Sequence, residues 1–492
     1  MQAMMKKFLV LAVLLVLASC QTSGSQSSWN RPGYEGGQAQ TGPSKLTREA
    51  MNAQVYSPYV PPGGESVPAQ QRPALQNGFD AMVSATAAGA NLPAPAPLPS
   101  GMYDLPPVKV ALLLPLSGEH SDLGQAMLQA AQLALFDMGY KAFELMPRDT
   151  KGKPADAANA AQAAIAEGAQ LILGPVFASE VRAVKPVAAQ RRINVIAFST
   201  DWTLAGGNTF IMGFLPFGQV ERVAEYASSN GIRNIAILAP ENAYGNAVIS
   251  AFNGQAYRSG ARATNIVKYT PGNREEASAL IRTFSNYDQR SKYMENRRLP
   301  LEARLKANPK DKAALEELKQ IGKEASANLP FDAILLPVGG EEAREISSLL
   351  NFYELEPDTV KRLGTGLWDD QVLATDTSLA GAWFAAPSPD LRRDFEIRYR
   401  DLYGMGAQRL ATLAYDATAL AAVLAKKGFQ ERGKPAYEHG DLTNPNGFAG
   451  IDGIFRFHQN GTVERGLAVL EYRRGDIKVL SPSPTTFERM DY

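Results

Sequence analysis

The side chains best suited to covalent or metal chemistry are few and lie far apart in the sequence. The three histidines, His120, His439 and His458, lack the spacing of metal ligands. The one cysteine, Cys20, excludes an internal disulfide and a cysteine-based zinc site. The chain also lacks the nucleophile elbow, the phosphate-binding loop, the zinc-protease helix and the dinucleotide-binding motif. We therefore expect no enzymatic activity, no metal and no cofactor.

Hydrogen-bond donors gather instead after an apolar run near residue 110. Residues Val108 to Leu114 begin with β-branched side chains and are nearly all apolar, which is typical of a parallel strand buried on both faces. Pro115 cannot donate to a ladder and should end the strand. Ser117 and Gly118 then form a turn, and a helical spacing of apolar residues begins at Leu123. Ligands of open α/β sheets lie beyond the strand ends, against helix N-termini, so this turn is a candidate site for a carboxylate or another small anion.

The same alternation of strand and helix repeats along the chain. Expected strands lie at residues 143–146, 171–173 and 193–197, and in a second set at 235–239, 264–269, 333–336, 362–366 and 382–385. Residues 210–214 should cross between the two sets. A late β-hairpin is expected from 453–457 and 466–472, joined by a turn at 459–461. Helices of ordinary length between the strands predict an α/β fold with two doubly wound parallel-sheet lobes.

A charged, helix-prone stretch at residues 285–329 interrupts the second set. It should form a helical hairpin that is an insertion in the second lobe. One interpretation is a solvated hairpin without a binding role. The other is a partner-docking element, because Leu299, Leu301, Leu315 and Leu318 could form an apolar seam.

The N-terminal segment has the pattern of an exported, lipid-anchored protein. Lys6 and Lys7 precede a short apolar run, and Leu17-Ala18-Ser19 precedes Cys20. This predicts a signal peptide at 1–19, and it resembles the lipobox of bacterial lipoproteins, in which the cysteine is acylated. By the same precedent, Gln21 favours an outer-membrane lipoprotein facing the periplasm. Residues 20–107, rich in Ser, Gly, Gln, Pro and Ala, should be a disordered tether.

Composition narrows the classes of partner. The chain has 492 residues, 45% of them hydrophobic, and a formal net charge of zero. That length suits two ordinary domains, and the lack of a basic excess argues against nucleic acid as a partner.

The strand and turn near residue 110 also carry a family resemblance. The sequence Leu112-Leu113-Leu114-Pro115-Leu116-Ser117-Gly118, followed by Leu123-Gly124 and an Ala-rich helix, resembles the first strand and helix of type I periplasmic binding proteins, above all their leucine/isoleucine/valine-binding branch. It is closer still to the penicillin-binding-protein activator lipoproteins. The resemblance implies a two-lobed domain at 108–480, with lobe 1 at about 108–213 plus 380–445 and lobe 2 at about 214–379 plus 446–480. Residues 481–492 would be a C-terminal tail.

The resemblance also implies which residues line a cleft between the lobes. They lie in the loops that follow the strands, where small residues, hydroxyls and helix N-termini favour a carboxylate. Tyr244 or Trp368 could cover an apolar part of a ligand. The alternative is that such residues only make tight turns. The cleft candidates are Ser117, Gly118, Ala178, Ser179, Ser199, Thr200, Asp201, Tyr244, Gly339 and Trp368.

The chain departs from amino-acid binders at several of these positions. The hydroxyl that holds the ligand carboxylate falls on Ala178, with Ser179 one residue late, and a threonine falls on Asp201. The ligand-stacking tyrosine falls near Gly339, and the carboxylate that holds the amino group falls near Leu367-Trp368. An aspartate about 4 Å from a ligand carboxylate costs roughly 4 kcal/mol at an effective dielectric near 20. We therefore expect no binding of leucine, isoleucine or valine, and a cationic or neutral polar ligand if any.

Two functions remain open. The first is a non-enzymatic lipoprotein that activates or regulates peptidoglycan synthesis by contact with a penicillin-binding protein. The helical-repeat domain that often precedes such activators is absent from this sequence. The alternative is a solute-binding lipoprotein of an ABC transporter for an amino acid or other small polar ligand.

Overall fold

A computed structural model describes residues 105–487, apart from the side chains of residues 255–259. The predicted signal peptide, Cys20 and nearly all of the predicted tether lie outside the described residues. Within residues 105–487, no helix is both long enough and apolar enough to span a membrane.

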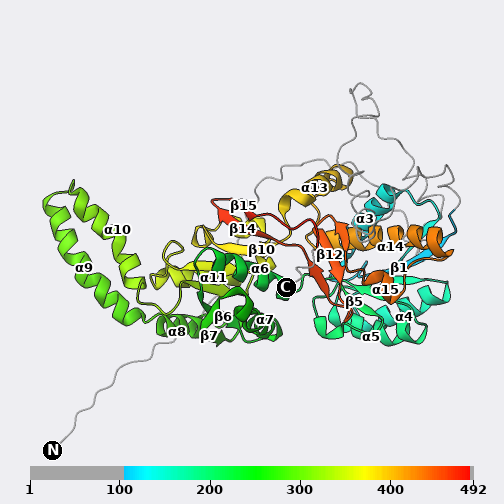
Figure 1. Cartoon of the computed structure of the whole chain (residues 1–492), viewed down its shortest axis with the longest axis horizontal. Coiled ribbons are helices and arrows are strands. Elements are labelled where there is room, and N and C mark those ends of the chain that lie inside the picture. Colours follow the sequence, from blue (N-terminus) through cyan, green and yellow to red (C-terminus); the bar gives the residue numbers. More distant parts are fainter. Residues whose placement is uncertain (1–104, 488–492) are drawn as a thin grey trace, which may run out of the picture. The chain divides into compact units, whose positions relative to one another are not determined.

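The first lobe is built on a parallel five-stranded sheet in the order β2-β1-β3-β4-β5. Helices α3 and α4 both contact β1, α3 packs with α14, and α4 packs with α5 (Figure 1). The elements in chain order are β1 (Val108–Leu114), α3 (Ser121–Met138), β2 (Phe143–Asp149), α4 (Pro154–Ala166), β3 (Leu171–Leu173), α5 (Ala178–Gln190), β4 (Val195–Ala197), η1 (Trp202–Leu204) and β5 (Thr209–Ile211). The apolar runs of β1, β3 and β4 are buried because helices cover both faces of the sheet.

The second lobe repeats this arrangement and extends it. Its seven-stranded sheet has the order β15-β14-β10-β9-β8-β6-β7, in which β7-β6-β8-β9-β10 matches the order of the first sheet. Helices α6 and α7 pack against one face, and α8 and α11 against the other. Its elements are α6 (Pro216–Ser229), β6 (Asn234–Pro240), α7 (Ala243–Ser259), β7 (Arg262–Tyr269), α8 (Arg274–Phe284), β8 (Ala333–Leu336), α11 (Gly340–Phe352), β9 (Lys361–Gly364), η2 (Gly366–Trp368), α12 (Gln371–Ala374), η3 (Thr377–Leu379), β10 (Trp383–Ala386), β14 (Ala468–Arg473) and β15 (Asp476–Ser481).

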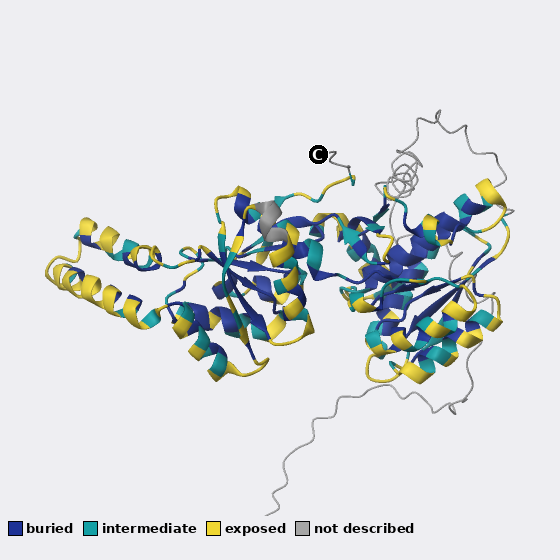
Figure 2. Ribbon diagram, turned by 60° about the horizontal axis from the view of Figure 1, so that its bottom comes forward, coloured by how far each residue is buried: buried dark blue, intermediate teal, exposed yellow. Residues whose placement is uncertain are grey.

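The C-terminal third of the chain returns to the first lobe. Buried residues of α13 and α14 form a cluster with α3, and a small antiparallel sheet of three strands joins the first-lobe core. Buried positions in Figure 2 follow the strands of both large sheets. These elements are α13 (Pro389–Tyr403), α14 (Ala411–Arg432), α15 (His439–Leu442), β11 (Phe448–Gly450), β12 (Gly453–Phe457) and β13 (Val463–Arg465).

The boundaries between the lobes differ from the predicted ones at two places. Strand β10 pairs with β9 and β14, so it belongs to the second lobe, not to the first as predicted. Strands β11 to β13 pack with the first-lobe core, so residues 448–465 belong to the first lobe, not to the second. The predicted hairpin also changes. Strand β12 turns at 459–461 and pairs with β13, whereas residues of the other predicted arm form β14 in the second sheet. The physical reason is the free edge of the second sheet: β14 pairs there with β10, and Leu467 just before β14 is buried in the second-lobe core.

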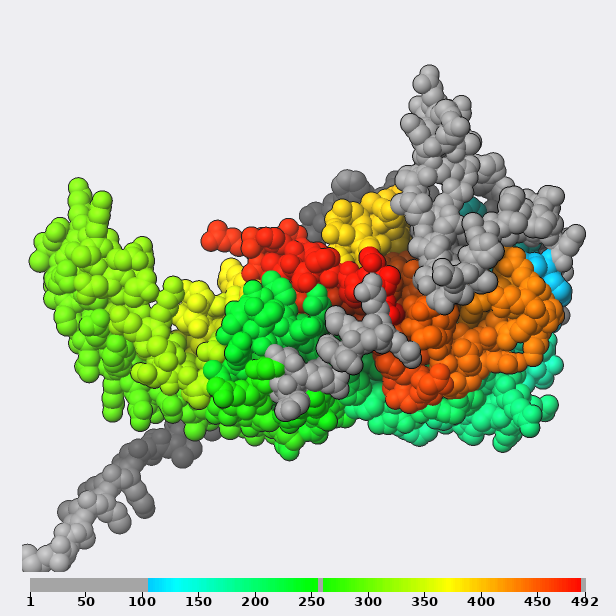
Figure 3. All heavy atoms as spheres, viewed as in Figure 1, coloured from blue at the N-terminus to red at the C-terminus, as the bar shows by residue number. Residues whose placement is uncertain are grey.

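The insertion forms two antiparallel helices, α9 (Tyr287–Ala307) and α10 (Lys312–Ser326), which lie at the edge of the second lobe (Figure 3). A small core of its own holds the pair together, and Leu301 is buried in it with Leu318 packed against it. The other two leucines of the predicted seam are exposed, Leu299 at 57% and Leu315 at 41%. The buried guanidinium of Arg290 fixes the base of the hairpin by donating to backbone carbonyls after α11.

One glycine in each lobe sets how closely the first helix approaches its strand. A Cβ atom on Gly124 of α3 would lie 2.1 Å from the Pro115 carbonyl oxygen. A Cβ atom on Gly245 of α7 would lie 2.1 Å from the Pro240 carbonyl oxygen. Both helices therefore need glycine to begin directly beside the end of the preceding strand.

Candidate functional site

The predicted site residues lie where the strands of the two sheets end. Because the carboxyl ends of parallel strands meet at one edge of a sheet, the loops after β1, β3 and β4 share an edge in the first lobe. The loops after β6, β8 and β9 share an edge in the second lobe. The ten predicted cleft candidates are therefore divided between two edges.

Ser117 and Gly118 form the turn after β1, and a neighbouring carboxylate holds it. The Ser117 hydroxyl donates to Asp149 Oδ2 at 2.5 Å, and the Leu116 and Ser117 amides donate to Oδ1. Burial opposes the charge of Asp149, but these bonds and one from the Lys151 amide outweigh it and lower its pKa. Asp149 is thus a charged partner of the turn, and Ser117 keeps only its acceptor lone pairs for other contacts.

The loop after β3 leads into a helix start without a side-chain cap. Phe177 is the N-cap of α5, and its side chain cannot accept a hydrogen bond. Ala178 is half-buried at the first helical position, and Ser179 is exposed at the second. Glu180 is buried and accepts a bond from the Phe177 amide at 3.1 Å, and its burial raises its pKa. The first amides of α5 are consequently available to an anion.

The loop after β4 is organised around Asp201. Ser199 is buried, and its hydroxyl accepts a bond from the Asp201 amide at 3.0 Å. The Asp201 carboxylate accepts from the amide and hydroxyl of Thr203, and lies 3.4 Å from the Arg182 guanidinium. Thr200 is exposed. Asp201 caps η1, and the positive charge of Arg182 offsets part of the repulsion between the Asp201 carboxylate and a ligand carboxylate.

The second-lobe candidates divide into accessible and inaccessible residues. The Tyr244 hydroxyl donates to Thr365 Oγ1 at 2.9 Å, and burial raises its pKa to about 12. Gly339 is the N-cap of α11 and offers no side-chain cap. A Cβ atom there would lie 3.0 Å from the Leu367 side chain, so a larger residue would require Leu367 to shift by a few tenths of an ångström. The uncapped start of α11 is therefore the second-lobe counterpart of the α5 start.

Trp368 does not face a ligand, contrary to the prediction that it covers one. It is fully buried, and its Nε1 donates to the Val338 carbonyl at 2.7 Å. Its ring packs against Phe384 and stacks on Tyr472. A Cβ atom on Gly364 would lie 2.2 Å from the indole, so the strand before it is shaped to the ring. The tryptophan is a core residue of the second lobe.

The residue after Trp368 takes part in a buried charge cluster that sequence reasoning missed. Asp369 accepts two bonds from Arg392, at 2.7 and 2.8 Å, and one from Arg409 at 2.6 Å. Arg409 also pairs with Asp452. Burial disfavours both guanidinium charges, but the neighbouring carboxylates outweigh it and raise the pKa of Arg392 and of Arg409. Only the carboxylate could have been noticed in the sequence, because the arginines follow it by 23 and 40 residues without any motif.

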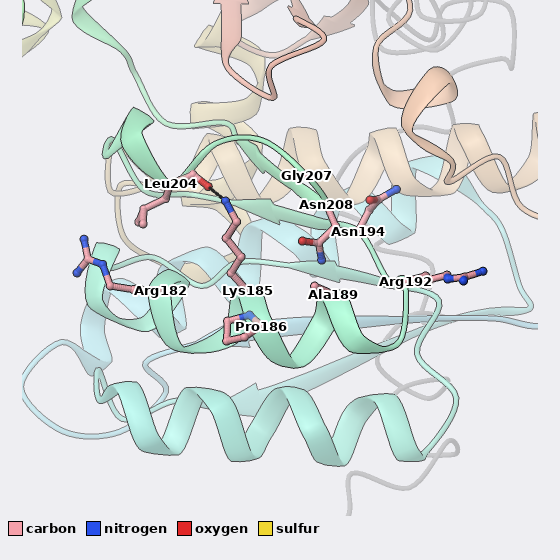
Figure 4. A pocket seen from close by; sticks show the side chains of 9 residues that line it. All are labelled: Arg182, Lys185, Pro186, Ala189, Arg192, Asn194, Leu204, Gly207 and Asn208. Atoms are coloured by element: carbon pink, nitrogen blue, oxygen red, sulfur yellow. Dashed lines mark hydrogen bonds between the residues drawn. The ribbon is translucent and has the colours of Figure 1, made fainter.

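A cavity of about 650 Å³ lies elsewhere on the first lobe, along α5. Figure 4 shows Lys185 reaching across it to the Leu204 carbonyl, a hydrogen bond of 2.7 Å. None of the predicted cleft candidates lines this cavity. Its lining residues are Arg182, Lys185, Pro186, Ala189, Arg192, Asn194, Leu204, Gly207 and Asn208. In the described part of the chain, no group of three or more His, Cys, Asp or Glu side chains is arranged to hold a metal ion.

Comparison with known proteins identifies the fold. The family model described as "Periplasmic binding protein" matches residues 107–288. A putative branched-chain amino acid ABC transporter protein from Rhodospirillum rubrum superposes with a TM-score of 0.60 at 16% identity, covering 76% of this chain and 100% of its own. The chain has the type I periplasmic-binding-protein fold. This confirms the predicted fold class of two parallel-sheet lobes.

Two further solved structures with this fold contain ligands. An ABC transporter substrate-binding protein from Desulfitobacterium hafniense, in complex with Leu, has a TM-score of 0.53 and 17% identity, covering 76% of this chain and 99% of its own. A solute-binding protein from Rhodopseudomonas palustris, in complex with 3,4-dihydroxybenzoic acid, has a TM-score of 0.52 and 16% identity, covering 77% and 97%. No curated protein matches the sequence. The resemblance to penicillin-binding-protein activators stays a prediction.

Proposed function

We propose that the chain is a non-enzymatic solute-binding protein that recognises a small carboxylate-bearing molecule at the strand ends of its two lobes. The observation that carries the proposal is that each lobe has a helix start without a side-chain cap at its strand-end edge, at Ala178 in the first lobe and at Gly339 in the second. Amides at a helix start favour an anionic group. Leucine and 3,4-dihydroxybenzoic acid, found with two proteins of this fold, share a carboxylate group.

The experiment removes one backbone donor without removing a helix. Proline is tolerated at the first helical position, and Phe177 before it has φ −91° and ψ 143°, a conformation that proline accepts in the preceding residue. Ala178→Pro therefore deletes the first amide of α5 and leaves the helix able to form. A matched control is Ser348→Ala on the exposed side of α11.

Thermal-shift measurements with a panel of amino acids and aromatic acids test the proposal. A ligand at a hundred times its dissociation constant adds about 2.7 kcal/mol to stability, which raises the melting temperature by a few degrees. We expect at least one carboxylate to raise the melting temperature of the native protein. Ala178→Pro should abolish this shift, whereas Ser348→Ala should keep it. Absence of any shift across the panel would count against solute binding.

A second function, activation of a penicillin-binding protein by contact, is favoured by the α9–α10 hairpin. Exposed Leu299 and Leu315 lie on an element that projects a charged surface and is not needed to complete either sheet. Adding the protein to a peptidoglycan synthase should then raise the synthesis rate, and the double substitution Leu299→Asp with Leu315→Asp should remove that effect. An unchanged rate with the native chain would exclude this function for the synthase tested.

We also propose that the protein is an outer-membrane lipoprotein facing the periplasm. The support is the single cysteine after Leu17-Ala18-Ser19 and the Gln21 that follows it. Two or three acyl chains on Cys20 give stable anchoring, where a single chain would be marginal.

A further inference from the structure

Asp369 connects the two lobes through a buried ion pair. It follows β9 of the second sheet, whereas its partner Arg392 lies in α13, which packs with the first lobe. The pairing is a two-pronged one, since two guanidinium nitrogens each donate to a different carboxylate oxygen. The side chain of Asp369 is 3% exposed and that of Arg392 is 7% exposed. Removing one partner of such a buried pair leaves an uncompensated buried charge, which is far more costly than the loss of a surface pair.

Arg409 forms a second ion pair with Asp369 and connects it to Asp452 in the interior of the first lobe. Its guanidinium donates to Asp369 and to Asp452, which also accepts a bond of 2.6 Å from the Thr412 hydroxyl. The same guanidinium lies over the ring of Phe214, 4.3 Å from its centroid. Phe214 lies in the first segment that crosses between the lobes, between β5 and α6. The cluster of Asp369, Arg392, Arg409 and Asp452 therefore contacts a segment that has to bend if the lobes change their orientation.

A third arginine joins the cluster at another crossing. Arg465, just before the segment that returns to the second lobe, donates to the Met212 carbonyl, and its guanidinium lies over the Phe214 ring, 4.8 Å from the centroid. The charged cluster therefore lies beside two of the segments that cross between the lobes, residues 212–215 and residues 466–467. Asp369 is the member of the cluster that comes from the second lobe.

We propose that Arg392 and Arg409 form a built-in latch on Asp369, which joins the lobes without solute and makes the site select against ammonium groups. The selectivity part rests on the proposed solute binding, whereas the latch does not. A carboxylate already held by two guanidinium groups is a poor partner for a ligand cation. Two carboxylates at the strand ends of the first lobe are held in a similar way, Asp149 by Ser117 and backbone amides, and Asp201 by Thr203 and Arg182. A solute with a carboxylate and no amino group therefore fits this set of groups better than an amino acid does.

The latch is tested by measuring the distance between the lobes in the full chain. Spin labels are placed at Gln162→Cys in α4 and Ser348→Cys in α11, both exposed, with Cys20→Ser as background. Asp369→Asn removes the charge at the latch. Asp370→Asn is the matched control, since it removes a charge one residue away at the N-cap of α12, where asparagine is an equally good cap.

We expect a narrow distance distribution in the background protein and in Asp370→Asn, and a broader, longer one in Asp369→Asn. Arg392→Lys, which keeps the charge but loses the two-pronged geometry, should give an intermediate broadening and serves as the test if Asp369→Asn does not fold. An unchanged distribution in Asp369→Asn, or equal broadening in Asp370→Asn, overturns the latch.

The selectivity is tested with leucine and 4-methylpentanoate, which differ by the amino group alone. We expect 4-methylpentanoate to bind the native protein at least as tightly as leucine. Leucine binding tenfold tighter overturns the selectivity. If no carboxylate in the panel binds at all, the proposed function fails, whereas the distance measurement still decides the latch.

Discussion

The substitution Asp416→Asn should change how the stability of the protein depends on pH. Asp416 lies in the second turn of α14 and is fully buried. One of its oxygens accepts a bond from the Ile451 amide at 2.7 Å, and the other has no hydrogen-bond partner among the described residues. Burial, and then the nearby charge of Asp452, raise the pKa of Asp416 from 3.8 to about 7, against the opposing effect of Arg465.

The sign and size of the effect follow from proton linkage. An acid whose pKa is raised by folding releases its proton more easily in the unfolded chain, so stability falls as pH rises from about 4 to about 7 and is level above that. A rise from 3.8 to about 7 corresponds to about 4 kcal/mol, because each tenfold change in proton affinity equals about 1.36 kcal/mol. Asparagine cannot ionise, so Asp416→Asn should lack this loss.

Urea unfolding at pH 4, 5, 6, 7 and 8 measures the difference directly. The stability of Asp416→Asn relative to the native protein should increase by up to about 4 kcal/mol across this range. Asp452→Asn is a companion variant of opposite sign at pH 7, and it also removes the charge that helps to raise the pKa of Asp416. Although burial opposes its charge, Arg409 and Arg465 lower the pKa of Asp452, so its ionised form stabilises the fold above pH 4 and its loss should destabilise the protein at pH 7. A native–variant difference for Asp416→Asn that is constant from pH 4 to pH 8 would refute the reasoning.

Three further predictions concern packing and anchoring. Gly124→Ala should lower stability by about 3 kcal/mol or more, because its Cβ would overlap the Pro115 carbonyl oxygen after β1. Gly254→Ala, which has open space around it in α7, should raise stability by about 0.5–1 kcal/mol. Urea unfolding of the two variants and the native protein measures both changes. Leu301→Ala in the hairpin core should lower local stability by about 2–4 kcal/mol, which would appear as faster amide hydrogen exchange in α9 and α10. Leu299→Ala, at an exposed position of the same helix, should leave that exchange unchanged. Cys20→Ala should release the protein from the membrane fraction, and unchanged membrane association would contradict lipidation.

The strand-and-helix pattern of the chain could be predicted from the sequence because it depends on local chemistry. Apolar runs such as that of β1 can be stable only when both faces of a sheet are covered. Pro115 ends that strand, and the helical spacing that follows defines α3. The repetition of this unit predicted the parallel two-lobed fold, and the solved structures confirm it. The charged composition of residues 285–329 likewise indicated a helical insertion, which α9 and α10 form.

Partners that are distant in the sequence were decided only by the tertiary structure. Trp368 stands in a strand-end loop like the ligand-facing residues of a binding protein, yet Gly364 and Tyr472 enclose its ring in the core. The path of the chain after residue 465 depends on which sheet offers β14 an edge, and this is not a property of the local sequence. Asp369 pairs with Arg392 and Arg409, which follow it by 23 and 40 residues, and no sequence motif indicates this contact. A buried charge is stable only where its counter-charges converge in three dimensions. The sequence therefore determined the strands and helices of the fold, whereas the tertiary structure alone decided which charged side chains are paired and which remain free for a ligand.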